Sequence, residues 1–246
     1  MSKELSAIRR DIIEMGYRAK TSHTASSLSV VDILWTIYEV KRPQDKVILS
    51  KGHASAALYA VLVAKGLMPR EYLAGFDVND GLLPKHVDMT VSDSIDASAG
   101  SLGHGASIGL GMAIADSSRN VYVVMGDGEM GEGAVWEAIA YSGANKIKNL
   151  KLIIDHNGLQ ILGSTKDTHG DNFVGKLRAF GHDSVEVDGH DPDSLTAALK
   201  GPATAVIART IKGKGASFME NRLEWHGKFP TDEQYVAVMK ELENAQ

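Results

Sequence analysis

The sequence contains no cysteine among its 246 residues. A disulfide framework, a thiolate nucleophile and a cysteine-ligated metal are therefore excluded. It also contains no apolar run of 18 residues, so no transmembrane helix is predicted. The first 20 residues are charged and amphipathic and do not contain the apolar centre of a signal peptide. From these absences we expect a cytoplasmic protein with no membrane partner.

Neither sign of charge is concentrated in one segment. The chain has 26 Lys and Arg residues against 31 Asp and Glu residues, a formal net charge of -5, and no run of five like charges. Nucleic-acid binding and polybasic membrane anchoring both depend on clustered Lys and Arg, so neither is expected. The hydrophobic fraction of 43% is ordinary for a globular protein, and the length allows one large α/β domain or two small ones.

Glycine, by contrast, is abundant and clustered. Of the 25 glycines, 11 cluster at 100–111, 126–133 and 212–215. Glycine at the end of an apolar run indicates that the backbone approaches something closely, and ordinary turn chemistry is the alternative. The ends of the apolar runs are therefore the places to look for a ligand site.

Apolar strands alternate with helical segments along the chain. Strands are predicted at 46–49, 120–125, 151–157, 183–188 and 203–208. Helices are predicted at 4–20, 28–40, 54–65, 102–116, 132–146, 191–200 and 231–244. Ser27 or Ser29 is predicted to cap the second helix, and the small, apolar helix at 102–116 to lie centrally. This alternation predicts one doubly wound α/β domain over residues 1–246, with a mostly parallel sheet and helices on both faces.

Polar residues follow two of the predicted strands. Gly126-Asp127-Gly128 comes directly after VYVVM, and Asp155-His156-Asn157 comes after KLII. Ligands bind beyond the carboxyl ends of the strands in open parallel sheets. A dinucleotide site is one hypothesis, because residues 126–131 satisfy G-x-G-x-x-G and Asp155 lies 24 residues further on. Against it, Asp127, Glu129 and Glu132 would crowd a pyrophosphate, and each such pair at 4 Å costs about 4 kcal/mol when the effective dielectric is near 20.

A cation between Asp127 and a diphosphate removes this repulsion. Mg²⁺ prefers six oxygen ligands at roughly 2.0–2.1 Å, some of them from phosphates and water. Asp127 and the side-chain oxygen of Asn157 would supply two, and a backbone carbonyl just beyond, at Leu159, a third. Gly126 and Gly128 would let the backbone approach the diphosphate, and the N-terminus of the following helix would add its positive dipole end.

The GDG motif and Asn157, separated by 28 residues, resemble the thiamine-diphosphate motif. The full string GDGEMGEGAVWEAIAYSGANKIKNLKLIIDHNG resembles the transketolase family in particular. This resemblance implies the thiamine-diphosphate-binding fold, thiamine diphosphate and Mg²⁺ as cofactors, and transfer of a two-carbon ketol unit between sugar phosphates.

Further segments resemble the same family in the same order. The loop 21–27 stands where the family has S-G-H-P-G or G-H-I-G, and the loop 83–88 stands where it has G-H-P-[DE], with Lys85 in place of glycine. The segments LSKGH, GSLGHG, TIKGKG and EWHGK also match. The resemblance implies catalytic roles for His23, His86 and His226. It implies cofactor contacts from Ser26, Lys51, His53, Ser101, Leu102, Gly103, Gly126, Asp127, Gly128, Glu132, Asn157, Lys212 and His226, and metal ligation by Asp127, Asn157 and Leu159.

Several histidines suit ketol transfer, because an unperturbed imidazole titrates near pH 6.5. We expect His23 and His86 to act on substrate oxygens, and His53 and His226 to bind the diphosphate or an anionic substrate. His104 could contact the cofactor, or its neighbours Gly103 and Gly105 could provide that contact alone. The remaining histidines match nothing in the family and are expected to be structural or exposed: His156, His169, His182 and His190.

The family's activating glutamate lies in a separate pyrimidine-binding domain, and no second strand–helix set able to carry it is visible here. The chain therefore resembles the N-terminal subunit of a split transketolase, whose partner would be the C-terminal subunit in an α2β2 assembly. Glu132 and Glu137 match acids near the family's subunit boundary, or are ordinary acids of a first helical turn. Two alternatives stay open: a subunit like 1-deoxyxylulose-5-phosphate synthase, and a non-catalytic thiamine-diphosphate-binding regulator.

Overall fold

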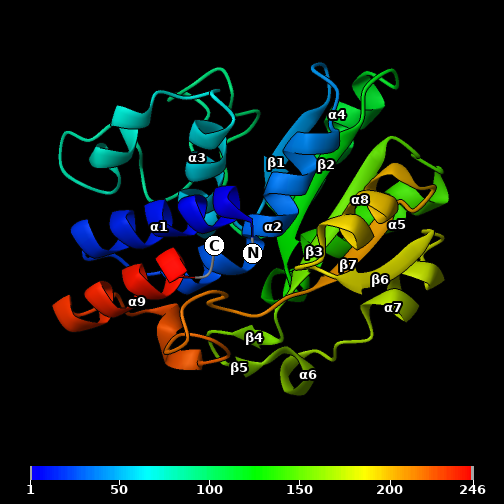
Figure 1. The fold of residues 1–246 in the computed structure, drawn as a ribbon. Helices are drawn as coiled ribbons and strands as arrows, with labels where there is room; N and C mark the ends of the chain where they lie inside the picture. The colour runs from blue at the N-terminus through cyan, green and yellow to red at the C-terminus, as the bar shows by residue number, and fades with distance from the viewer. Residues whose placement is uncertain (1, 245–246) are drawn as a thin grey trace.

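The computed structural model describes residues 2–244. Its centre is a five-stranded parallel sheet in the order β1-β2-β3-β7-β6 (Figure 1). The strands are β1 (Lys46–Leu49), β2 (Val121–Gly126), β3 (Leu150–His156), β6 (Ser184–Asp188) and β7 (Ala205–Arg209). All five strands predicted from the apolar runs are confirmed, as is the doubly wound α/β class.

The longer helices also lie close to where the sequence places them. They are α1 (Lys3–Arg18), α2 (Thr24–Val40), α3 (Ser55–Ala64), α4 (His104–Ala115), α5 (Gly133–Ala144), α8 (Pro192–Lys200) and α9 (Asp232–Asn244). Four short elements between β3 and β6 were not predicted: the hairpin strands β4 (Leu159–Gln160) and β5 (Gly163–Ser164), and the helices α6 (Thr165–Thr168) and α7 (Phe173–Ala179).

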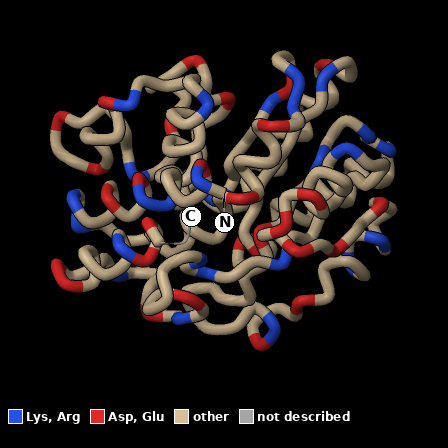
Figure 2. Tube along the Cα trace, viewed as in Figure 1, with Lys and Arg blue, Asp and Glu red and all other residues tan. Residues whose placement is uncertain are grey.

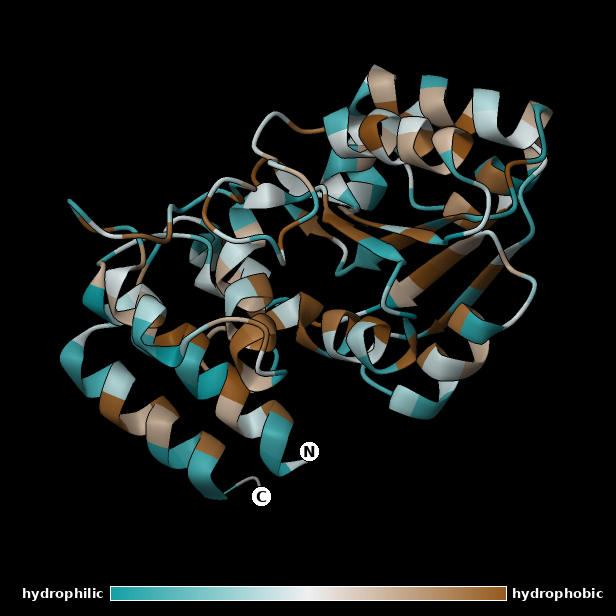
Figure 3. Cartoon of the chain, turned by 90° about the horizontal axis from the view of Figure 1, so that it is seen from above, coloured by the Kyte–Doolittle hydropathy of each residue, from teal (hydrophilic) through white to brown (hydrophobic). Residues whose placement is uncertain are grey.

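Alternate residues of β1, β2, β3 and β7 belong to two separate cores, one on each face of the sheet. Val124 and Ile153 pack with α1, α2, α3 and α8, whereas Val123 and Leu152 pack with α4, α5 and α7. Figure 3 shows the hydrophobic strands enclosed between these two helical layers. Because both faces are covered, the central strands β2 and β3 are buried along their whole length, as expected for a parallel sheet, whereas the edge strand β6 is partly exposed and includes Glu186 and Asp188.

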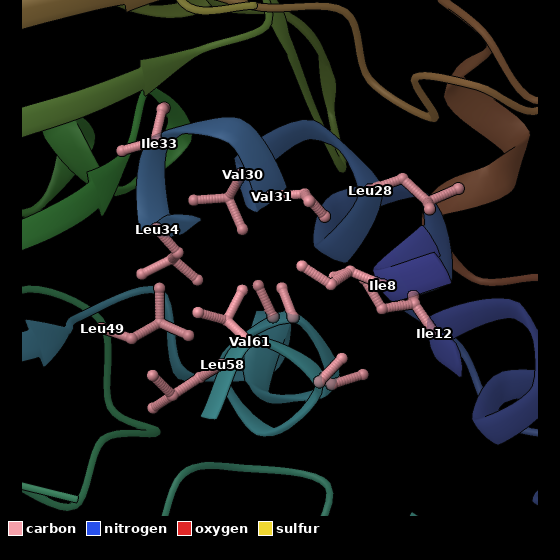
Figure 4. Packing of buried hydrophobic residues seen from close by; sticks show 14 of the residues in the cluster. Ile8, Ile12, Leu28, Val30, Val31, Ile33, Leu34, Leu49, Leu58 and Val61 are labelled. Carbon is pink, nitrogen blue, oxygen red and sulfur yellow. The ribbon is translucent and has the colours of Figure 1, made fainter. Parts of the chain in front are cut away.

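The larger core joins the first three helices to the sheet. Ile8 and Ile12 of α1, Leu28 of α2 and Leu58 of α3 meet there and are at most 2% exposed (Figure 4). Burying each such side chain contributes about 1.5–3 kcal/mol. The C-terminal α9 packs along α1, so the two ends of the described chain lie side by side (Figure 1).

Two local predictions need correction. The second helix begins at Thr24, so neither Ser27 nor Ser29 caps it. Ser29 instead donates a hydrogen bond to Asp155 Oδ2 at 2.6 Å. The helix at 102–116 packs closely on the sheet through its glycines but is not central, because Ile108 and Ile114 on its outer face are 37% and 52% exposed.

The distribution of charged residues and the lengths of the apolar helices agree with what the sequence predicts. Figure 2 shows Lys and Arg interspersed with Asp and Glu along the chain. Within residues 2–244, no helix is long and apolar enough to cross a membrane.

Candidate functional site

The site lies where the carboxyl ends of the central strands meet. β1 leads into Lys51, β2 into Asp127, β3 into Asn157, and β7 into the segment that carries Lys212. A cavity of about 420 Å³ opens at this edge. Its lining includes His23, Ser26, Lys51, His53, His86, Leu102, Gly126, Asp127, Gly128, Glu132, Asn157, Leu159, Lys212 and His226. These residues were singled out from the sequence, and the fold brings them together.

Glu129 holds the glycine loops of this edge in place. One of its carboxylate oxygens, Oε1, accepts hydrogen bonds from Ser50 Oγ and from the backbone N–H of Gly103 at 2.8 Å, and Oε2 accepts one from the N–H of Gly126 at 3.2 Å. The residue is 2% exposed. Burial raises the pKa of Glu129, although these hydrogen bonds oppose the rise. Its role in joining three loops was not recognised in the sequence, where it counted only as a repulsive carboxylate.

The carboxylate of Asp127 is buried without a cationic partner. It accepts hydrogen bonds from the N–H of Gly128 at 2.8 Å and of Gly158 at 2.6 Å, and it is 2% exposed. None of the lysines, arginines and histidines in residues 2–244 forms an ion pair with it. Burial, reinforced by the charge of Asp155, raises the pKa of Asp127 to about 7. A bound cation at this position would stabilise the ionised form.

Lys51 forms an ion pair with Asp155, behind the cavity surface. Its Nζ lies 2.5 Å from Asp155 Oδ2 and donates to the carbonyl oxygen of Ser26 at 3.1 Å. Asp155 is fully buried and also accepts hydrogen bonds from Ser29 and Thr210. Burial raises the pKa of Asp155, but the charge of Lys51 and these hydrogen bonds outweigh it and hold the pKa below its ordinary value. Lys51 therefore fixes the strand end and lines the cavity.

Four imidazole rings cluster on one wall of the cavity. The ring centroid of His23 lies 5.1 Å from that of His53, 6.2 Å from that of His86 and 5.1 Å from that of His226. His23 has a left-handed backbone with φ of 75°, immediately before α2, and its N–H donates to the His226 carbonyl at 3.2 Å. The sequence predicted these histidines as functional, and they converge from four separate segments.

Burial keeps three of these rings neutral. Burial and the neighbouring His226 lower the pKa of His23 to about 3, and burial and Lys212 lower the pKa of His226 to about 4. The pKa of His53 is also lowered, chiefly by burial and by Lys51. The ordinary imidazole value near 6.5, assumed from the sequence, therefore does not hold for them. At neutral pH these three rings accept and donate hydrogen bonds as uncharged groups.

The chain is similar to known proteins over nearly its whole length. A family model described as "Transketolase, thiamine diphosphate binding domain" matches residues 2–243. The 6-deoxy-6-sulfo-D-fructose transketolase subunit SqwG of Clostridium sp. (strain MSTE9) is 35% identical, over 99% of this chain and 96% of that protein. One of the subunits of the apulose-4-phosphate transketolase of Actinobacillus succinogenes is 36% identical, with the same coverages.

This chain belongs to the transketolase family. It corresponds to the family's thiamine-diphosphate-binding domain. Human transketolase is 33% identical over 90% of this chain, but the match covers only 38% of that protein. A transketolase variant from Pichia stipitis has the same fold with a TM-score of 0.90, at 25% identity, and the match covers 99% of this chain and 40% of that one. The two relatives named as subunits match over nearly their full length, whereas this chain matches only part of the human transketolase.

Some residues implied by the family resemblance lie outside the cavity. Ser101 is exposed beside the neighbouring depression that His104 lines, and Glu137 is exposed on α5. Gly103 is buried behind the cavity wall with φ of 89°, a left-handed conformation that glycine adopts at no steric cost. The turn after β2 continues as a short 3-10 helix, and α5 begins at Gly133, close to the predicted start of that helix. Its N-cap residue Glu132 lines the cavity, and the contribution of the helix dipole to diphosphate binding stays a prediction.

Five lining residues were not assigned to the site from the sequence, although Gly100 lies in the matched segment GSLGHG, and the partners of two histidines were not predicted. Gly100, Glu129, Gln160, Ile161 and Leu162 also line the cavity. The apolar pair 161–162, which follows the polar end of a strand, was the sequence signal that could have indicated the β4–β5 hairpin at the cavity. Two of the histidines read as structural or exposed have defined partners near the site. His169 Nε2 lies 3.0 Å from the Asp127 carbonyl oxygen, and His190 contacts Asp32.

The donor set fits Mg²⁺ held together with a diphosphate. Asp127 offers a buried carboxylate, and Asn157 and Leu159 line the same cavity. Within residues 2–244, no group of three His, Asp or Glu side chains is placed to bind a metal ion alone. A hard cation here would therefore need amide, carbonyl and phosphate oxygens in addition to Asp127, which is how magnesium is bound beside phosphates.

Proposed function

We propose that this chain is the diphosphate-binding subunit of a two-subunit, Mg²⁺-dependent transketolase that transfers a two-carbon ketol unit between sugar phosphates. The observation that carries the proposal is the convergence, in one cavity, of the unpaired carboxylate of Asp127 with the four imidazoles of His23, His53, His86 and His226. A diphosphate and metal would occupy one end of this cavity, and the reacting sugar would meet the histidines at the other.

Asp127, Asn157 and the Leu159 carbonyl are proposed to hold Mg²⁺, with Ser26, Lys51, His53, Leu102, Gly126, Gly128, Glu132, Lys212 and His226 around the cofactor. Ser101 and Gly103 would act through the shape of their turn. Thiamine diphosphate, when bound, supplies the carbanion chemistry of ketol transfer. Lys212 is 1% exposed and lines the cavity, so its positive charge would offset the negative charge of the diphosphate.

The histidines would handle protons of the sugar. His23 is neutral near pH 7 because burial depresses its pKa, so its ring can accept a hydroxyl proton and return it. His86 is more exposed than His23, at the cavity mouth, and is proposed to act on the same reacting oxygens. His226 is paired with Lys212 and is proposed to bind anionic groups and to contribute to catalysis.

The partner is proposed to be the C-terminal transketolase subunit, carrying the pyrimidine-binding domain. The cavity rim exposes apolar side chains for which a covering surface is expected: Ile161 is 68% and Leu162 is 82% exposed. The exposed acids Glu132 and Glu137 are proposed to lie at this boundary, beside Tyr141, which is 53% exposed. The single-domain organisation of this chain, the α2β2 stoichiometry and the cytoplasmic location stay predictions.

The two subunit relatives act on a 6-deoxy-6-sulfo sugar and on apulose 4-phosphate by their names. Both names describe a sugar that carries an anionic group. We therefore propose an anionic ketose as the donor. The altered loops at His23 and His86, where Lys85 replaces a glycine, allow for a specialised sugar.

Calorimetric titration of thiamine diphosphate tests the cofactor assignment. The chain mixed with its partner subunit should bind the cofactor in the presence of Mg²⁺ and lose most of that affinity when EDTA replaces the metal. The chain alone should bind weakly, because it supplies only the diphosphate half of the site. Tight binding that is indifferent to metal would contradict the proposal.

A further inference from the structure

Two side chains far apart in the sequence, Arg9 and His190, bind the segment that carries Lys212 through a partly buried hydrogen-bond network that the family resemblance does not explain. Lys212 is 1% exposed, lines the cavity and lies on the irregular segment 210–215 that follows β7. An irregular segment has no ladder of its own to fix its backbone. Backbone hydrogen bonds hold part of this segment, from the N–H of Gly213 to the carbonyl oxygen of Ala25 and from the N–H of Asn221 to that of Lys212, both at 3.0 Å. Side chains supply further contacts to its backbone.

One carboxylate oxygen binds both of the side chains that contact the segment. Asp32 Oδ2, in α2, lies 2.5 Å from Arg9 Nη2 and 2.7 Å from His190 Nδ1. Arg9 Nε donates to the carbonyl oxygen of Lys214 at 3.1 Å. His190 Nε2 is 2.8 Å from the backbone nitrogen of Ile211. The two residues that flank Lys212 at 211 and 214 are thus bound, through Arg9 and His190, to the same atom.

The donor and acceptor pattern fixes the state of the imidazole. The N–H of Ile211 can only donate, so His190 Nε2 must accept, and the proton of the neutral ring is therefore on Nδ1 and is donated to Asp32. Arg9 is 1% and Asp32 is 4% exposed, so this pair is shielded from water. Burial raises the pKa of Asp32, but the hydrogen bond from His190 and the charge of Arg9 bring it below its ordinary value, so the carboxylate stays ionised.

Resting on the proposed function, we propose that His190, oriented by Asp32, is a positioning residue that fixes the Ile211–Lys214 segment and so directs the Lys212 ammonium into the diphosphate cavity. His190 does not line the cavity and acts only through the backbone of Ile211. The alternative is a structural role, in which the network only joins α1, α2 and the chain after β7.

Two substitutions at one position separate these roles. In His190→Asn the side-chain amide can replace Nδ1 and donate to Asp32, but nothing accepts from Ile211. In His190→Gln the longer side chain places an oxygen near the former Nε2 and can accept from Ile211. His182→Asn is the control, because His182 is buried, forms hydrogen bonds with Thr204 and Ile139, and does not line the cavity.

The first readout is independent of any ligand. NMR titration of the full chain labelled with ¹³C-lysine, with the Lys212 signal assigned by its loss in Lys212→Met, should give a pKa of about 8 for Lys212, against an ordinary value of 10.5. In His190→Asn the pKa should move toward the ordinary value as the released segment lets the ammonium reach water, and in His190→Gln and His182→Asn it should stay near that of the unaltered chain. An unchanged Lys212 pKa in folded His190→Asn would overturn the proposal.

The second readout is the dissociation constant of Mg²⁺–pyrophosphate, measured by calorimetry. His190→Asn should raise it about tenfold, the lower end of what losing a positioning hydrogen bond costs at metal sites. The same substitution in a Lys212→Met background should change it less than twofold. Equal changes in both backgrounds would show that His190 acts elsewhere. If the unaltered chain binds no pyrophosphate, the proposed function fails, while the lysine titration still decides the role of His190.

Discussion

The Nζ atom of Lys212 lies 3.0 Å from Nδ1 of His226 inside the cavity. An ammonium group can only donate, so the imidazole accepts at Nδ1 and its own proton is on Nε2. Burial lowers the pKa of both groups, to about 8 for Lys212 and about 4 for His226. The pair therefore carries one positive charge at neutral pH, located on the lysine.

The charge on Lys212 predicts a pH dependence of cofactor binding. Because the free lysine has a pKa of about 8, the positive charge that attracts a diphosphate is present below pH 8 and is lost as the pH rises through it. The dissociation constant for Mg²⁺–thiamine diphosphate should rise about tenfold between pH 7 and pH 9. In Lys212→Arg this rise should disappear, because a guanidinium group stays charged over the whole range. A profile identical in both proteins would exclude Lys212 as the titrating group.

Replacement of Asp127 should abolish the metal dependence of binding. Asp127→Ala removes the one carboxylate proposed to ligate Mg²⁺, and we expect cofactor affinity to fall about 100-fold or more. Calorimetry with and without Mg²⁺ measures both effects. Asp167→Ala, an exposed acid on α6 that does not line the cavity, is the control and should bind as the unaltered chain does. Equal affinity of the unaltered protein with and without Mg²⁺ would remove the metal assignment.

His86 and His226 should differ in which kinetic parameter they control. His86→Ala should lower kcat about 100-fold or more in the assembled enzyme, the range of general acid–base catalysis, and leave the cofactor dissociation constant nearly unchanged. His226→Ala should chiefly weaken cofactor binding, since it removes the partner of Lys212. Steady-state kinetics at saturating cofactor, together with calorimetry, separate the two. The assignment of roles is wrong if both variants show only a raised cofactor dissociation constant.

Glu129 should matter for stability. In Glu129→Gln one amide hydrogen must face a backbone N–H, either that of Gly103 or that of Gly126, both of which donate to the carboxylate. We expect a loss of about 1–3 kcal/mol in the free energy of unfolding, the cost of an unsatisfied buried donor. Urea denaturation measures it. The control is Glu137→Gln at an exposed acid, which should change the free energy of unfolding by less than about 0.5 kcal/mol. Equal losses in the two variants would contradict the role of Glu129 in holding the glycine loops in place.

The sequence predicted the fold well because the sheet is apolar on both faces. Four of the five strands are short, largely apolar runs, and in a parallel sheet the residues that follow such runs meet at one edge. Asp127 and Asn157 are therefore expected to be neighbours from the sequence alone. The convergence of His23 and His226 came from the family resemblance, since no local pattern brings residues of such different sequence position together.

The contacts that escaped prediction are long-range or involve very short elements. Ser29 looks like a helix cap, but its hydroxyl bonds to Asp155, which is 126 residues away. The contact between Asp32 and His190 spans 158 residues. The strands β4 and β5 have two residues each, too short for a period-2 pattern to be visible.

The activity of this chain alone tests the central claim most directly, namely that half of a shared active site lies on this subunit. The purified chain, with thiamine diphosphate, Mg²⁺, xylulose 5-phosphate or another anionic ketose as donor and an aldose phosphate as acceptor, should show no ketol transfer. Addition of the partner subunit should restore turnover with a donor that suits the assembled enzyme, and should tighten cofactor binding. Steady turnover by this chain without a partner, with contaminating transketolase excluded, would contradict the account.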